Sequence, residues 1–296
     1  MNTKELFFNI VIKKITLLFL VIFGFNSVES SAQLSTIKAR LVANTMSNAP
    51  ADFQITGYLA ILQINGSFSD INYSDNSSST TFPAANHITR LKQMCIVYNK
   101  IESSYYHSSV LKAQIVLAFE YFYNNRPISS NWWFQAISIP IDLSQAILLM
   151  ATSDTFGFTQ AQLDKYSNKA NLTSANGGVL YYYTKAIQQW PNSATGANQT
   201  WLINNANYKA CIEGNETEFI SNCNVISGDL RIISSVGDGI KPDGSFYQHG
   251  ELAYTFGYGL YYMEGVSNFM ALVDGTTYQL SDDKKNVMAN QLLDGF

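Results

Sequence analysis

The sequence predicts an all-α protein, and three observations support this fold class. Apolar residues recur at helical spacing, strand-like alternation is scarce, and connectors rich in Asn, Ser and Gly separate the periodic segments. Of the 296 residues, 47% are hydrophobic, 14% are aromatic and 14% are charged. Disorder and coiled coil are excluded, because both require charge-rich, aromatic-poor chains.

Two segments show the helical period most clearly. One face of 87–100 carries Ile88, Leu91, Cys95 and Tyr98, and one face of 110–123 carries Leu111, Ile115, Ala118 and Phe122. Pro140 suits the first turn of the next helix, and Ser281 with two following aspartates suits the start of the last one. Further helices are predicted over 141–151, 159–170, 178–190, 198–213, 216–227, 257–273 and 281–294.

The N-terminus has the pattern of a secretory signal over residues 1–32. Lys13 and Lys14 precede an apolar run from Ile15 to Phe25, and small residues allow cleavage after Ala32. The run is too short to span a bilayer comfortably, although an uncleaved anchor is the alternative. We expect a secreted or periplasmic protein with one domain over 33–296, monomeric and without membrane attachment after signal removal.

Charge and cysteine content exclude further classes. The net charge of −4 offers no basic field for nucleic acid. No Cys/His spacing resembles a zinc site, and three histidines exclude a histidine-rich metal centre, so we expect no metal and no cofactor. Cys211 and Cys223 could form a disulfide after export, or remain buried free thiols, as could Cys95.

Two loops echo each other, Asn65-Gly66-Ser67-Phe68 and Asp243-Gly244-Ser245-Phe246. Asx-Gly is strong turn chemistry, so each predicts a tight turn that runs into a short extended piece. The stretch 65–81 is a long polar loop, a kind that is often functional.

Three clusters could carry chemistry, and each has a purely structural alternative. His249 and Tyr258, nine residues apart, lie in a glycine- and tyrosine-rich segment and could face one cleft. Asn198 lies near the start of a helix, where it could simply be an N-cap. Asn131, Trp132 and Trp133 could bind sugar through a flat amphipathic ring, or the tryptophans could both be core.

Taken together and in order, these motifs resemble polysaccharide lyase family 8, which includes chondroitin AC, hyaluronate and xanthan lyases. The resemblance rests on Asn-Trp-Trp at 131–133, Ile-Pro at 139–140, Thr-Gly-Ala-Asn at 195–198, and Asp-Gly-Ser-Phe-x-Gln-His at 243–249 with Tyr258. It covers roughly residues 35–296, with weaker likeness over Leu62–Asp70 that favours the chondroitin AC type.

The resemblance implies an incomplete α/α toroid of helical hairpins around a long cleft. It also implies that the toroid's last helices and the C-terminal β-sandwich domains are absent from these 296 residues. The implied reaction is β-elimination at a uronic acid within an acidic polysaccharide. Asn198 matches the residue that binds the uronate carboxylate, His249 the catalytic histidine and Tyr258 the base. Asn131, Trp132 and Trp133 match sugar-binding positions.

The chain departs from the family pattern at two places. Phe134-Gln135-Ala136 stands where the family usually has an acidic residue. The family's catalytic arginine lies well beyond the histidine, whereas Arg231 is the last arginine here and precedes His249. A free tyrosine has an ordinary pKa of about 10, so a tyrosine base needs a neighbour that favours the phenolate.

Three functions are therefore compared. The first is an active polysaccharide lyase, and the second is a sugar-binding remnant that cannot turn over. The third, an inverting glycosidase, needs paired carboxylates, for which Asp238, Asp243 and Glu251 are the candidates. The sequence does not select the polysaccharide or endo against exo action.

Overall fold

A computed structural model describes residues 33–76, 78, 80–151, 155–167 and 194–295. The predicted signal over 1–32 and the predicted helix over 178–190 lie outside these residues. Most of the described chain is helical, so the all-α prediction is confirmed. The helices are 33–46, α2 Asp52–Ile61, α3 Ala85–Asn99, α4 Ser109–Asn125, η1 Phe134–Ser138, α5 Ile139–Ala151, α6 Gln160–Ser167, α8 Gly196–Glu213, α9 Glu216–Asp229, η2 Thr255–Gly259, α10 Leu260–Val273 and α11 Asp282–Asp294.

The predicted helical faces are the buried ones. All four apolar residues named on α3 and all four named on α4 are buried. Two helices, α2 and 33–46, were not predicted. Helix α2 buries Ile55 alone, so its sequence has no apolar stripe to detect, whereas 33–46 buries a stripe of Leu34, Ile37 and Leu41 directly beside the signal-like segment.

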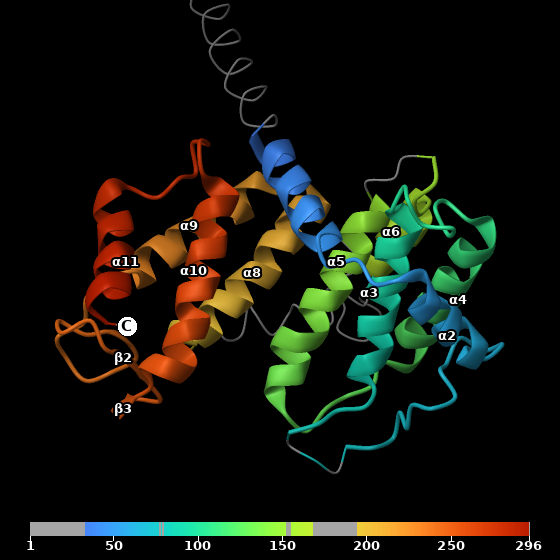
Figure 1. Ribbon diagram of the computed structural model, residues 1–296, viewed down its shortest axis with the longest axis horizontal. Helices are drawn as coiled ribbons and strands as arrows, with labels where there is room; N and C mark the ends of the chain where they lie inside the picture. The colour runs from blue at the N-terminus through green and yellow to red at the C-terminus, as the bar shows by residue number, and fades with distance from the viewer. Residues whose placement is uncertain (1–32, 77, 79, 152–154, 168–193, 296) are drawn as a thin grey trace, which may run out of the picture.

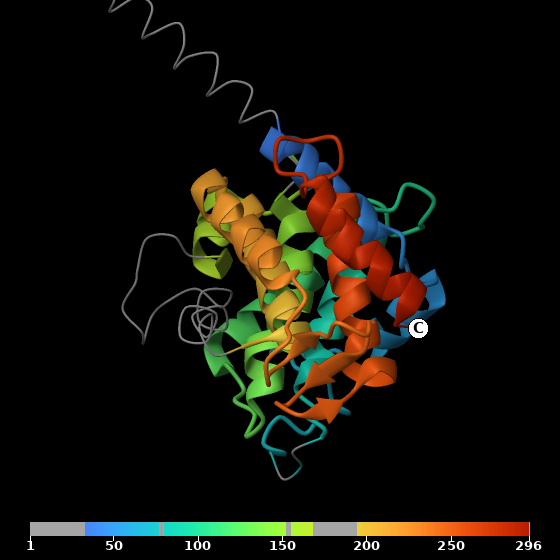
Figure 2. The same ribbon diagram turned by 90° about the vertical axis from the view of Figure 1, so that its left-hand side faces the viewer.

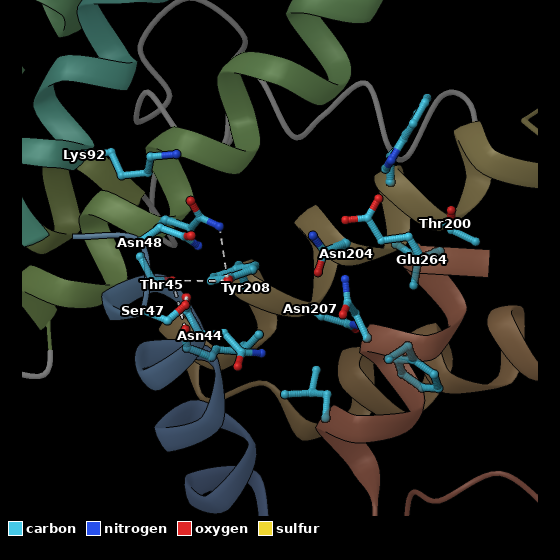
Figure 3. A pocket seen from close by; sticks show the side chains of 18 of the residues that line it. Asn44, Thr45, Ser47, Asn48, Lys92, Thr200, Asn204, Asn207, Tyr208 and Glu264 are labelled. Carbon is cyan, nitrogen blue, oxygen red and sulfur yellow. Dashed lines mark hydrogen bonds between the residues drawn. The ribbon is translucent and has the colours of Figure 1, made fainter. Parts of the chain in front are cut away.

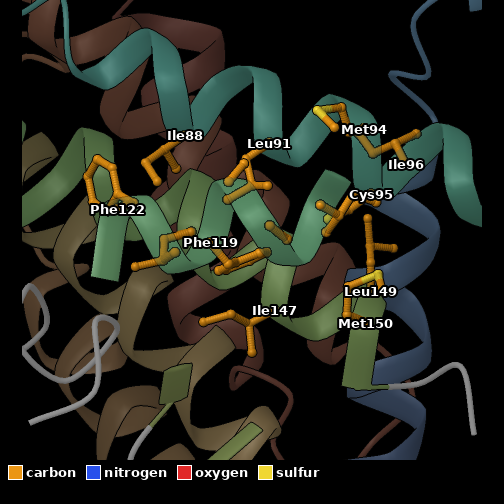
Figure 4. Packing of buried hydrophobic residues seen from close by; sticks show 14 of the residues in the cluster. Ile88, Leu91, Met94, Cys95, Ile96, Phe119, Phe122, Ile147, Leu149 and Met150 are labelled. Carbon is orange, nitrogen blue, oxygen red and sulfur yellow. The ribbon is translucent and has the colours of Figure 1, made fainter. Parts of the chain in front are cut away.

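The helices form two groups with separate hydrophobic cores. Figure 1 shows α2 to α6 on one side and α8 to α11 on the other. The first core packs α3, α4 and α5 together, and Figure 4 shows Leu91 and Cys95 of α3 facing Phe119 of α4. The second core packs α8, α9, α10 and α11. Helix α5 contacts both α3 and α8 and so joins the two groups.

Helix 33–46 links the start of the described chain to its far end. The guanidinium of Arg40 donates hydrogen bonds to the carbonyls of Leu272 and Asp274, both at 2.7 Å. Gln33 accepts hydrogen bonds from the backbone N–H and the hydroxyl of Thr277. Figure 2 shows this helix beside the C-terminal helices. The helical hairpins therefore curve around a centre, as in an incomplete α/α toroid.

A small antiparallel sheet interrupts the helices between α9 and η2. Its strands, of two, three and two residues, are β1 Gly239–Ile240, β2 Phe246–Gln248 and β3 Leu252–Ala253, in the order β1-β2-β3. They are too short to show alternation, so the sequence did not predict them as a sheet. Within the described residues no β-sandwich occurs.

The two echoing loops have the same structure, which confirms the predicted turns. Gly66 and Gly244 both have left-handed φ angles, of 88° and 80°. In each loop the Asx oxygen accepts hydrogen bonds from the N–H and hydroxyl of the serine two residues on. Each turn also leads into an extended residue, Phe68 or Phe246, and both phenylalanines are buried.

Two further sequence expectations are resolved by the fold. Cys95, Cys211 and Cys223 are all free and buried, so the thiol alternative holds and the disulfide does not form. The segment Phe134–Ala151 is long and apolar enough to cross a membrane, with a mean hydropathy of 1.4, although the sequence had suggested no such segment after the signal. Because 61% of it is buried against other helices, it serves as a core helix.

Candidate active site

His249 and Tyr258 meet at the edge of the small sheet. Their ring centroids lie 5.0 Å apart with the planes at 90°, an edge-to-face contact. His249 is exposed in the turn between β2 and β3, and Tyr258 is half-buried in the π-helix η2. Single π-helical turns occur often at functional sites. The structure thus brings together two of the candidate residues that the sequence separated by nine positions.

Strand β2 positions both rings. Its last residue precedes His249, and its first residue, Phe246, donates its N–H to the hydroxyl of Thr255 in η2. Phe246 also accepts the N–H of Tyr254, and a Cβ added to Gly259 would lie 2.9 Å from the Phe246 Cβ. Glycine at 259 therefore allows η2 to lie directly on β2, which fixes Tyr258 relative to the His249 turn.

Asn198 lies in the first turn of α8, but it is not the N-cap. The N-cap position belongs to Thr195, and the N–H of Ala197 is bonded by the side chain of Gln248 at 3.3 Å. The structural alternative for Asn198 is therefore wrong. Its Oδ1 atom is buried and has no hydrogen-bond partner among the described residues. A buried polar atom without a partner needs an explanation, and a bound ligand is one that the position of Asn198 allows.

The contact between Ala197 and Gln248 also brings the Asn198 segment to the His249 turn. Asn198 is the residue after Ala197, and His249 is the residue after Gln248. The three residues proposed for catalysis therefore come from α8, the β2–β3 turn and η2, and all three segments meet at β2.

A row of aromatic rings connects the tryptophan motif to Tyr258. Trp133 packs edge-on against Trp201 of α8, with centroids 6.2 Å apart, and Trp201 lies 6.3 Å from Tyr258 and 5.4 Å from Tyr261. Trp133 also packs against the buried cluster that contains Ala136, Ile137, Ala194 and Leu202. Trp133 is therefore partly core, and Trp201 is the residue that links it to the Tyr258 ring.

Trp132 and Asn131 differ from Trp133 in their surroundings. Trp132 is 38% exposed, so its ring is accessible to a ligand. Asn131 accepts the N–H of Trp133 at 2.9 Å and so caps the helical segment that starts there. The predicted polar loop borders this segment, because Asn76 accepts the N–H of Ser130.

A polar cavity of about 600 Å³ lies between the two helix groups, and Trp201 lines its edge. In Figure 3, Asn44 of helix 33–46 and Asn48 of the turn that follows it face Asn204, Asn207 and Glu264 across the cavity. Carboxamides dominate its lining: Asn44, Asn48, Gln93, Gln145, Asn204, Asn207 and Asn268. The aromatic row and this cavity therefore share Trp201 and Tyr261.

Two of the three carboxylates proposed for a glycosidase, Asp238 and Asp243, have other partners. Both oxygens of Asp238 accept hydrogen bonds within the loop and from α8, and Asp243 accepts from Ser245 in its turn. The hydrogen bonds of Ser245 lower the pKa of the Asp243 carboxyl. These two groups hold the backbone in place, so the arrangement does not resemble an inverting pair.

The structure also places the residues at the two departures from the family pattern, Gln135 and Arg231. The side chain of Gln135, on η1, has its Nε2 atom buried without a partner among the described residues. Arg231, at the end of α9, donates to the carbonyl of Gly228 and lies beside Asp229. Within the part of the chain that the structure describes, no cluster of three His, Cys, Asp or Glu residues could hold a metal ion.

Several residues of this region were missed by sequence reasoning. Trp201 and Tyr254 contact Tyr258, and Gln248 holds the His249 turn together with Asp238, which the sequence had suggested only for a glycosidase. Gln248 belongs to the motif that carries the resemblance, so its position beside His249 was a usable signal. Nothing in the sequence separated Trp201 from an ordinary core tryptophan.

Comparison with known proteins identifies the family and supports the helical fold. Residues 42–296 match the family described as "Polysaccharide lyase family 8, N terminal alpha-helical domain". Chondroitinase-AC from Pedobacter heparinus is 26% identical over 239 residues, which cover 80% of this chain and 31% of that protein. Xanthan lyase from Bacillus sp. (strain GL1) is 28% identical over 204 residues, or 67% of this chain and 20% of that protein. The chain thus spans a third or less of the length of these relatives.

Solved structures show the same helical arrangement. A chondroitinase AC lyase, solved as enzyme–oligosaccharide complexes, superposes with a TM-score of 0.73 at 25% identity, covering 88% of this chain and 36% of that one. A Paenibacillus xanthan lyase gives a TM-score of 0.66 at 22% identity over 92% of this chain and 25% of that one, which supports the fold. The match over 42–296 shows that this chain belongs to polysaccharide lyase family 8.

Proposed function

We propose that the protein is a polysaccharide lyase that cleaves an acidic, uronic-acid-containing polysaccharide by β-elimination. The observation that carries the proposal is the edge-to-face contact of His249 and Tyr258 beside the α8 turn with the unpartnered Asn198. The relatives named chondroitinase-AC and xanthan lyase support the substrate class. Because such polymers lie outside the cell, the proposed site of action is outside the cell or in the periplasm. We also propose that the protein acts as a monomer.

In this proposal Tyr258 is the base and Asn198 stabilises charge. The Tyr258 phenolate takes the C5 proton of the uronate, the C4–O bond breaks, and the proton passes to the leaving glycosidic oxygen, which leaves a C4=C5 double bond. Removing the C5 proton places a second negative charge on the uronate carboxylate. A flip of the Asn198 carboxamide presents its NH₂ to that charge, and such a donor is most effective in a water-excluded site.

His249 assists and the aromatic row binds sugar. The imidazole lies against the Tyr258 ring, where it can assist proton abstraction or hold the uronate carboxylate. Trp132 offers an accessible ring face to a pyranose, and Asn131 and Trp133 hold that ring's segment in place. The reaction as written requires neither a metal nor an organic cofactor.

An absorbance assay tests the proposal. The purified chain is incubated with chondroitin sulfate, hyaluronan and xanthan, and the ultraviolet absorbance of the unsaturated uronate is followed. A rise with one of these substrates is the expected result. No rise with any of them, together with retained binding by calorimetry, would reject the lyase in favour of a sugar-binding protein. The observation that keeps this second function in view is that Arg231, the last arginine of the sequence, precedes His249 and donates to the carbonyl of Gly228.

A further inference from the structure

His249 has a backbone conformation that non-glycine residues rarely adopt. Its φ angle is 58°, in the left-handed region, and that of Gly250 is 85°. For an L-residue this left-handed conformation is energetically unfavourable. It therefore persists only where the surroundings fix it. These two residues turn the chain between β2 and β3 and expose the imidazole.

One carboxylate holds the chain on both sides of His249. The Oδ1 atom of Asp238 accepts the backbone N–H of Gly250 at 2.7 Å. Its Oδ2 atom accepts the side-chain Nε2–H of Gln248 at 2.5 Å. Hydrogen bonds to an ionised acceptor are about twice as strong as those between neutral groups. Asp238 thus fixes the residues that immediately precede and follow His249.

The same carboxylate also reaches the start of α8. The hydroxyl of Thr195 donates to Asp238 Oδ2 at 2.6 Å, and Gln248 Nε2 donates to the carbonyl of Thr195 at 3.3 Å. Gln248 is 1% exposed, and its Oε1 accepts the N–H of Ala197. A Cβ added to Gly196 would lie 2.3 Å from that Oε1 atom, so glycine is required there. The turn and the helix are held in contact with little freedom to separate.

We propose that Asp238 is a positioning residue that sets the His249 imidazole relative to both Tyr258 and Asn198. The proposal rests on the proposed function for its meaning in catalysis. The proposed effect of Asp238 on the contact between the His249 and Tyr258 rings can be tested without turnover. Asp238 touches neither ring; it acts through Gln248, Gly250 and Thr195.

The test replaces Asp238→Asn in the full chain, with Asp243→Asn as the matched control. Asp243 lies in the same loop, but its oxygen bonds only Ser245 among the described residues. In Asp238→Asn one acceptor oxygen becomes an NH₂ donor that faces other donors. We expect the nuclear Overhauser effect between the His249 and Tyr258 ring protons to be lost in Asp238→Asn and kept in Asp243→Asn. Thermal unfolding by circular dichroism identifies any variant that fails to fold.

The kinetic measurement separates positioning from stability. A misplacement of about 1 Å can lower turnover by roughly 100-fold. We therefore expect kcat of Asp238→Asn to fall by about 10- to 100-fold while KM changes little. A retained ring–ring Overhauser effect, or a kcat equal to that of the wild type, would overturn the proposal. If the wild type itself shows no turnover, the proposed function fails, and the Overhauser measurement alone decides whether Asp238 positions His249.

Discussion

The rings of His249 and Tyr258 are in edge-to-face contact, with their centroids 5.0 Å apart and their planes at 90°. Strand β2 joins the two segments that carry these rings, because it ends at the His249 turn and its residue Phe246 bonds η2, which contains Tyr258. The two side chains therefore form one unit, in which a change to the phenol alters the chemistry and leaves the ring packing intact.

Tyr258→Phe is the substitution that isolates this phenol. It removes the hydroxyl and keeps the ring that packs on His249, Tyr254 and Trp201. Because positioned general acids and bases contribute about 10²–10⁴-fold, we expect the absorbance assay to lose at least roughly 100-fold in rate. The melting temperature should stay near that of the wild type. Unchanged turnover in Tyr258→Phe would show that another group is the base.

Trp132→Ala and Trp133→Ala should have different consequences. Trp132 is 38% exposed, whereas Trp133 packs on Trp201 and on a buried cluster. We expect Trp132→Ala to weaken oligosaccharide binding in calorimetry with little change in melting temperature. Trp133→Ala should also lower stability, by about 2–4 kcal/mol for a partly buried tryptophan. Equal losses of stability in the two variants would contradict this division.

Sequence reasoning predicted the helices because their apolar faces are the buried faces. Leu111, Ile115 and Phe122 of α4 all lie in the core, so the apolar periodicity of the sequence marks the face of the helix that packs. Apolar periodicity does not predict a helix that buries few side chains, as in α2. It also does not predict strands of two or three residues, which are too short to show alternation. The paired Asx-Gly turns were predictable, since Gly66 and Gly244 need left-handed φ angles.

The candidate site was predictable as a set of residues but not as an arrangement. Motif order placed Asn198, His249 and Tyr258 in one site, but their contacts depend on a tertiary network. Gln248 bonds Ala197 across 51 positions, and no local pattern reports such a bond. Trp201 has the same limitation, because its role depends on Trp133 lying 6.2 Å away.

The three cysteines should be unreactive in the native protein. Burial raises the pKa of the Cys211 and Cys223 thiols to about 12 and raises that of Cys95 further. Because the thiolate is the reactive form, a colorimetric disulfide reagent at pH 8 should label none of them quickly. After denaturation all three should react. A single reactive thiol after denaturation would instead indicate a Cys211–Cys223 bridge.

His87 should make the fold sensitive to acid. Burial lowers its pKa from the ordinary 6.5 to about 4, and its two ring nitrogens bond Tyr73 and the carbonyl of Ala118. The unfolded chain takes up the proton at about pH 6.5, so stability is complete above that pH and falls until about pH 4. The loss amounts to roughly 3 kcal/mol. Urea unfolding of His87→Asn across this range should lack that loss, whereas His249→Asn, at an exposed histidine, should keep it.

Asp229 should have the opposite effect over nearly the same range. Burial raises its pKa from the ordinary 3.8 to about 6, although Arg231 and a hydrogen bond from Tyr262 lower it. The folded state therefore holds the proton more tightly than the unfolded state, and stability falls as pH rises from about 4 to about 6. We expect Asp229→Asn, which keeps an acceptor for Tyr262, to be more stable than the wild type at pH 7.5, by roughly 3 kcal/mol. At pH 4 it should be equally stable.

Because these two groups titrate in opposite senses, the wild-type profile should be nearly flat between about pH 4 and 6. Each single variant should reveal the slope of the group that remains. Asp229→Asn should gain stability as pH rises, since His87 alone then titrates, and His87→Asn should lose it, since Asp229 alone does. Asp243→Asn is the control, because hydrogen bonds from Ser245 lower the pKa of that carboxyl. Urea midpoints at half-unit pH steps would measure all four proteins, and parallel profiles for the two single variants would contradict the assignment.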